Sequence, residues 1–137
     1  MNNRLSRNSF VRVFGLVALL VLVFVVSIPA SANTSGSWTI YEDTTLVEDH
    51  DGNIVIGEDG VTLDCAGHTI TGSGNGNGIL LPGREGVTVR NCHVTGFDLG
   101  IFLDWSSGST IESNLSWDNA YDGIRLNYSN QNALTGN

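Results

Sequence analysis

The sequence contains no lysine, and its six basic residues are all arginines. Three of these, Arg4, Arg7 and Arg12, lie close to the N-terminus, so the segment 33–137 combines three arginines with all 14 acidic residues, a formal net charge of −11. Nucleic-acid binding requires clustered positive charge on a protein surface. This charge balance therefore excludes nucleic acid as a partner.

Cysteine and proline are also scarce, with two of each against 17 glycines. Two cysteines exclude a disulfide-dense scaffold, and the glycines lack the three-residue period of collagen. No segment after position 32 has the 3.6-residue period of an amphipathic helix. We therefore expect a β-rich chain with glycine at its turns.

The N-terminus has the three parts of a secretory signal peptide, which we assign to residues 1–32. Arginines precede an uncharged apolar run over 13–26, and Ala30 and Ala32 then provide the small residues that a signal peptidase requires. The alternative is an uncleaved membrane anchor, but the run is shorter than the ~20 residues of a membrane span. We expect cleavage before Asn33, no membrane span afterwards, and a mature chain that is secreted, periplasmic or at the cell surface.

The rest of the sequence repeats with a period of roughly 22 to 26 residues, which is in the range of solenoid repeats. Residues 78–81, 100–103 and 123–126 each read glycine, isoleucine, any residue, leucine. Such short runs alternate apolar and polar residues between turn residues, which is typical of strands. Because the runs recur in the same direction, equivalent strands must pair in parallel on successive coils, about 4.8 Å apart. This predicts an all-β solenoid with three short strands per coil and about four coils.

The inward-facing apolar residues of this solenoid should stack into one continuous column. They are predicted to be Val61, Leu63, Ile70, Ile79, Leu81, Val87, Val89, Val94, Ile101, Leu103, Ile111, Ile124, Leu126 and Leu134. Asn114 and Asn137, which lie one period apart, should stack at a corner and hydrogen-bond along the column.

Residues 60–72, with the sequence GVTLDCAGHTITG, resemble the first coil of right-handed parallel β-helix proteins. That group includes the NosD-like proteins, named for a periplasmic copper-binding protein, and carbohydrate-binding and sugar-hydrolase relatives. The resemblance covers residues 36–137. It implies an N-terminal capping region at 33–60 and parallel β-helix repeats at 61–137.

The sequence ends at Asn137, at the corner after a strand, without the polar or covering cap that terminal coils of solenoids need. We therefore expect a short member of the group, truncated at the C-terminus. We also expect self-association through the uncapped end, because unpaired strand edges template further pairing.

Cys65, His68, Cys92 and His93 fall on adjacent coils at one corner of the predicted solenoid. For a secreted protein, this spacing favours a disulfide between Cys65 and Cys92. Two alternatives are buried free thiols and a metal site made by all four side chains, for which copper would suit the soft ligands.

Asp64, Arg90 and Glu112 follow inward residues on three successive coils, in the order minus, plus, minus. Opposite charges stacked across neighbouring strands predict an ion-pair ladder on the surface. The alternative is an acid/base cluster of a glycoside hydrolase or a lyase. We assign no catalytic residue.

Trp105 and Tyr128 occupy equivalent turn positions one period apart, and Trp117 is predicted to face outward elsewhere. Exposed aromatic rings can hold sugars by packing on their flat faces, so these three are the candidate ligand-binding residues. The alternative is that the two turn residues staple adjacent turns by stacking on each other.

Together these features predict a secreted or cell-surface β-helix that binds polysaccharide or a surface layer, or serves as a structural module there. The alternatives are a polysaccharide hydrolase or lyase and a NosD-like metal-handling accessory protein. We expect no cofactor.

Overall fold

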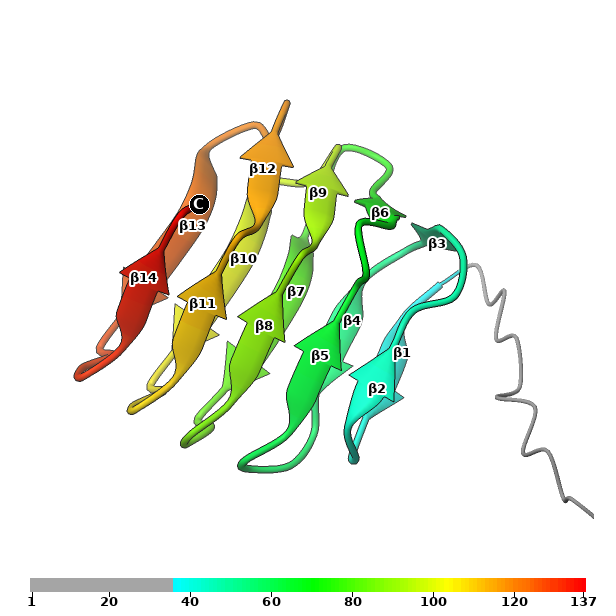
Figure 1. Cartoon of the computed structure of the whole chain (residues 1–137). Coiled ribbons are helices and arrows are strands. Elements are labelled where there is room, and N and C mark those ends of the chain that lie inside the picture. The colour runs from blue at the N-terminus through cyan, green and yellow to red at the C-terminus, as the bar shows by residue number, and fades with distance from the viewer. Residues whose placement is uncertain (1–35) are drawn as a thin grey trace, which may run out of the picture.

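Short runs of alternating apolar and polar residues form every element of the structure, a computed structural model that describes residues 36–137. Each run makes a strand of two to six residues, and glycine, serine, asparagine or aspartate occupies the turns between strands. Successive strands wind into a parallel β-solenoid with coils stacked side by side (Figure 1). Residues 36–137 contain no helix long and apolar enough to cross a membrane.

Three parallel sheets, here called A, B and C, form the sides of the solenoid. Sheet A consists, in spatial order, of β1 (Trp38–Ile40), β4 (Ile54–Ile56), β7 (Asn77–Pro82), β10 (Leu99–Asp104) and β13 (Asp122–Asn127). Sheet B consists of β2 (Thr44–Thr45), β5 (Thr62–Asp64), β8 (Thr88–Arg90), β11 (Thr110–Glu112) and β14 (Ala133–Thr135). Sheet C consists of β3 (His50–Asp51), β6 (Thr69–Thr71), β9 (His93–Thr95) and β12 (Leu115–Trp117).

The strand register follows the sequence repeat. Ile101 of β10 pairs with Ile79 of β7 on one side and with Ile124 of β13 on the other. These partners are the isoleucines that recur once in every period of the sequence. The predicted all-β solenoid, with three short strands per coil and about four coils, is therefore confirmed.

The core lies inside the coils and consists of the inward side chains of all three sheets. Eleven of the 14 predicted inward residues, from Val61 to Ile111, are buried, and Ile124 packs partly buried against them. The prediction was wrong for Leu126 and Leu134, whose exposed fractions are 39% and 46%. Both side chains lie in the last described coil, so no later coil among residues 36–137 covers them.

Polar side chains at the turns form hydrogen-bonded ladders parallel to the apolar column. Asn114 Oδ1 accepts from the backbone N–H of Cys92, and Asn114 Nδ2 donates to the carbonyl of Val89, both at 3.0 Å. Asn137 repeats these bonds one coil later, to the N–H of Asn114 and the carbonyl of Ile111. The predicted stacking of the two asparagines is confirmed.

Serines form a second ladder, at the turn between sheets A and B. Ser106 Oγ accepts from the N–H of Arg84 at 2.9 Å and donates to the carbonyl of Leu81 at 2.8 Å. Ser129 Oγ in turn accepts from the N–H of Ser106 and donates to the carbonyl of Leu103. Each of these turn amides thus has a partner in the next coil, which fixes the positions of the turns.

Candidate functional site

Trp105 and Tyr128 form a stacked pair on the turns between sheets A and B. Trp105 directly follows β10 and Tyr128 directly follows β13, so the two residues lie on consecutive coils. Their ring centroids are 4.4 Å apart and the ring planes meet at 18°. The exposed fractions are nevertheless 66% for Trp105 and 71% for Tyr128. The pair therefore projects from the turns into solvent and is not part of the core.

The backbone of this aromatic pair is in the left-handed region, with φ of 56° at Trp105 and 47° at Tyr128. The equivalent residue of the preceding coil is Gly83, with φ of 65°. A residue with a Cβ pays about 1–2 kcal/mol for this conformation, whereas glycine does not. Left-handed backbone recurs at other turns of the solenoid, where Ala66, Asn91, Ser113, Asp118 and Gln131 also have positive φ, so it is a general property of these turns. The aromatic pair thus carries a conformational cost at a position that glycine would fill without it.

Polar groups lie beside the aromatic pair on the outer face of sheet A. Asp104 and Asn127 immediately precede the two aromatic residues and are paired in register. Asn127 Nδ2 donates to Asp104 Oδ1 at 2.7 Å. Within residues 36–137, Asp104 Oδ2 and Asn127 Oδ1 have no hydrogen-bond partner. Two oxygen acceptors therefore remain free on the residues that directly precede the aromatic pair in the chain.

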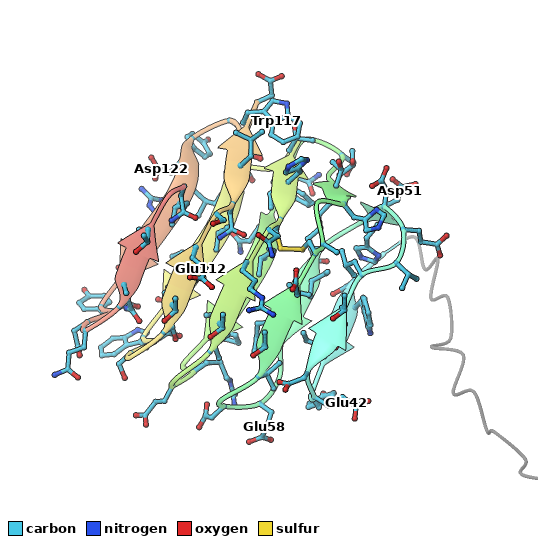
Figure 2. The ribbon with its side chains drawn as sticks, viewed as in Figure 1. Glu42, Asp51, Glu58, Glu112, Trp117 and Asp122 are labelled. Carbon is cyan, nitrogen blue, oxygen red and sulfur yellow. A yellow bond between two sulfur atoms is a disulfide. The ribbon has the colours of Figure 1, made fainter. Side chains whose placement is uncertain are left out.

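The corner between sheets B and C holds the predicted cysteine and histidine cluster. Cys65 and Cys92 are buried and form a disulfide, with their Cα atoms 4.7 Å apart, drawn as a yellow bond in Figure 2. His68 instead lies beside Asp49, with Nδ1 3.4 Å from Oδ1, and His93 packs against an indole ring. Both sulfurs are therefore committed to each other, and the four side chains do not converge on one point.

A family model for the right handed β-helix region matches residues 30–137. The chain belongs to this β-helix family. No curated protein and no solved structure matches it. Family membership specifies the fold, but one solenoid architecture hosts many unrelated activities, so the function must be argued from the site.

Trp117 lies away from the aromatic pair in this β-helix. It belongs to β12 of sheet C, at the top of Figure 2, whereas the pair lies on turns between sheets A and B. Its ring meets His93 edge to face, with centroids 5.9 Å apart. The structure therefore brings two of the three predicted ligand-binding residues together and leaves the third on another face.

Of the predicted charge ladder on sheet B, the structure forms the ion pair between Asp64 and Arg90, whereas Glu112 is aligned with Arg90 only in register. Arg90 is in register with Asp64 on one side and Glu112 on the other, and its Nε lies 2.9 Å from Asp64 Oδ2. Hydrogen bonds from Asn91 and from the backbone of Ala66, followed by the bond from Arg90, hold the pKa of Asp64 below its usual value. A carboxylate stabilised in this way is poorly suited to act as a general acid or base.

Metal binding was an alternative for Cys65, His68, Cys92 and His93. Residues 36–137 contain no group of three or more histidine, cysteine, aspartate or glutamate side chains arranged to hold a metal ion. Figure 2 shows that labelled acidic residues such as Glu42, Asp51, Glu112 and Asp122 are distributed around the coils of the β-helix and are not gathered at one point.

A shallow hollow of about 600 Å³ lies at the corner between sheets C and A. Its lining includes Asp51, Asn53, Asn75 and the glycine-rich turn before β7. Phe97 also contributes, but only 4% of this residue is exposed. The hollow therefore offers polar groups without an open aromatic face.

The sequence did not single out Asp104, Asn127 or Gly83 as site residues. A signal for them was present, because Asp104 and Asn127 recur one period apart and immediately precede the aromatic pair. Gly83 occupies the equivalent turn position one coil before Trp105, so the stack of aromatic side chains does not extend to that coil.

Proposed function

We propose that this β-helix is a glycan-binding module of the cell exterior and that the aromatic pair, Trp105 and Tyr128, is its contact surface. The observation that carries the proposal is the exposure of two stacked aromatic rings on neighbouring turns. A structural staple does not require large ring surfaces in solvent, whereas Trp105 and Tyr128 keep exposed fractions of 66% and 71%.

The chemistry of the surroundings suits a sugar. A pyranose ring offers a flat apolar face of C–H groups and a rim of hydroxyls. Aromatic rings bind apolar faces through burial and packing, while Asp104 and Asn127 offer hydrogen-bond acceptors beside them. Binding sites of this type combine an apolar surface with a few polar groups that fix orientation.

The proposed location outside the cell rests on two features. The signal sequence proposed for residues 1–32 lies outside the described residues, so its support is the sequence pattern alone. The disulfide between Cys65 and Cys92 fits an oxidising compartment, where such bonds persist.

The other roles have less support in the described residues. The metal site considered for Cys65, His68, Cys92 and His93 would use both sulfurs as ligands, but Cys65 and Cys92 are bonded to each other. Hydrolysis would require a pair of carboxyl groups flanking a bound sugar, whereas Asp64 is engaged by Arg90. Binding is the function that the geometry supports best.

The proposal can be tested by electrophoresis of the mature chain through gels containing individual polysaccharides. We expect at least one polysaccharide to retard the wild-type protein. Trp105→Gly and Tyr128→Gly should abolish the retardation, because each removes a ring. Trp117→Ala, which removes a tryptophan from sheet C, is the matched control and should leave retardation unchanged.

The glycine variants also separate binding from folding. Glycine relieves about 1–2 kcal/mol of left-handed backbone strain, which offsets the lost stacking, so we expect their free energies of unfolding to stay within about 1 kcal/mol of wild type. The proposal fails if no polysaccharide retards the wild-type protein, or if the Trp105→Gly/Tyr128→Gly double variant is retarded as strongly.

A further inference from the structure

The ring of Trp105 has one covered face and one open face. Tyr128 stacks on it from the following coil. On the other side, the equivalent residue of the preceding coil is Gly83, which has no side chain. An exposed fraction of 66% at Trp105 requires that this second face be largely open to solvent.

The space over Gly83 is unfilled. A Cβ atom built on Gly83 would meet no heavy atom within 4 Å. The next residue, Arg84, donates from Nε to the carbonyl of Pro82 in its own coil, and its Nη1 lies 3.7 Å from Asp59 of the preceding coil. On the side of its open face, Trp105 therefore has only the backbone of Gly83 as its neighbour. The two residues lie on adjacent coils, which are about 4.8 Å apart.

No unpaired arginine of residues 36–137 lies near this open face. Each of the three arginines in residues 36–137 is paired with an aspartate: Arg84 with Asp59, Arg90 with Asp64 and Arg125 with Asp122. An ion pair presents a dipole and no net positive charge. The chain around these pairs is strongly acidic, so a polyanionic ligand would meet uncompensated repulsion.

The free polar atoms of Asp104 and Asn127 disfavour a carboxylate placed against them. Asp104 Oδ2 and Asn127 Oδ1 are acceptors. Sugar hydroxyls can donate to them, whereas an ionised uronate carboxylate is itself only an acceptor. A neutral sugar therefore matches both the charge and the hydrogen-bonding pattern of the site.

We propose that one uncharged sugar unit of the glycan stacks on the face of Trp105 that lies over Gly83, with its hydroxyls directed to Asp104 and Asn127. This inference rests on the proposed function and narrows it, because it gives the position of the stacking subsite and excludes polyuronates as ligands. Gly83, Trp105 and Tyr128 occupy equivalent turn positions on three successive coils. The subsite is the space that a side chain at Gly83 would otherwise fill.

The position is tested by filling the gap. Gly83→Asn places a side chain against the open face of Trp105, and asparagine tolerates the left-handed backbone better than other residues with a Cβ. We expect retention by a neutral polysaccharide to weaken at least about tenfold, with an unchanged unfolding midpoint. Gly67→Asn is the matched control: Gly67 also has a positive φ and open space around it, but it lies at the corner between sheets B and C. That variant should bind as wild type does.

The ligand class is tested by comparing neutral polysaccharides with polygalacturonate and alginate at low and high salt. We expect binding of a neutral polysaccharide whose affinity changes little with ionic strength, because contacts without net charge are not screened. The two polyuronates should not bind at low salt.

The outcomes separate this inference from the function on which it rests. Polyuronate binding that requires the aromatic pair would overturn the inference and leave glycan binding standing. Normal binding by Gly83→Asn would overturn the position of the subsite alone. If no polysaccharide of either class binds, both the inference and the proposed function are wrong.

Discussion

Cys92 donates its backbone N–H to Oδ1 of Asn114, 3.0 Å away in the next coil. The same corner therefore holds a covalent link and an amide ladder in one column: the disulfide joins Cys65 to Cys92, and Asn114 and Asn137 continue toward the end of the chain. Coils of a solenoid contact only their neighbours. This column consequently couples several coils along one corner.

We expect loss of the disulfide to be costly. Cys65 and Cys92 are 27 residues apart, and the chain-entropy relation gives a loop of that length about 3.5 kcal/mol. The Cys65→Ser/Cys92→Ser double variant should lose about this much free energy of unfolding in denaturant titrations. Wild type measured in reductant should match the variant. A difference below about 1 kcal/mol would show that the link contributes little to coil stacking.

Replacing Asn114 should lower the free energy of unfolding nearly as much as loss of the disulfide does. Asn114→Leu leaves the N–H of Cys92 and the carbonyl of Val89 buried without partners, at about 1–3 kcal/mol each. Asn137→Leu is the control, because Asn137 makes equivalent bonds but is exposed in the last described coil. We expect a loss of about 3 kcal/mol for the first variant and less than about 1 kcal/mol for the second. Equal losses of stability in the two variants would contradict the claim that the hydrogen bonds of Asn114 matter more because they are buried.

His50 is predicted to be a stability defect. Only 2% of its surface is exposed, and within residues 36–137 neither ring nitrogen has a hydrogen-bond partner. Its ring instead contacts that of Trp38, with centroids 5.7 Å apart. His50→Leu removes the unpaired polar atoms and should raise the free energy of unfolding by about 1 kcal/mol. Destabilisation by a similar amount would instead indicate that the imidazole has a partner in the folded protein.

The hydrogen bonds and the ion pair of Asp64 predict that the free energy of unfolding depends on pH. Hydrogen bonds from Asn91 and Ala66, together with Arg90, lower the pKa of Asp64 in the folded state. A lowered pKa contributes stability above the unfolded value of about 3.9, and this stability is lost as the pH falls through the folded value. Unfolding titrations from pH 6 to pH 2 should show wild type more stable than Asp64→Asn at the upper end. The two curves should converge in acid, and parallel curves would contradict this assignment.

The sequence was sufficient to predict the sheets because the inward isoleucines and leucines recur at nearly constant spacing. Ile79, Ile101 and Ile124 specify the register of sheet A without any knowledge of the turns. The predicted burial failed only where a neighbouring coil is needed on both sides, as at Leu126 and Leu134. A periodic pattern shows which way a residue faces, but it does not show what covers that residue.

The site was less predictable than the fold. The sequence shows that Trp105 and Tyr128 are equivalent, but it does not show that their backbone is left-handed or that Gly83 leaves one ring face open. Those features depend on how the turn closes. Ser106 and Ser129 were missed for a related reason, because serine is common in turns and its role in a ladder appears only once the coils are stacked.

The central claim is that a sugar contacts the ring of Trp105, and its most direct test is fluorescence from that ring alone. A Trp38→Phe/Trp117→Phe variant retains Trp105 as its single tryptophan. Titration with a neutral oligosaccharide derived from the polysaccharide that retards wild type should shift its emission saturably, because stacking removes water from the indole. Gly83→Asn added to this variant should remove the shift. Unchanged emission at saturating oligosaccharide would contradict the account.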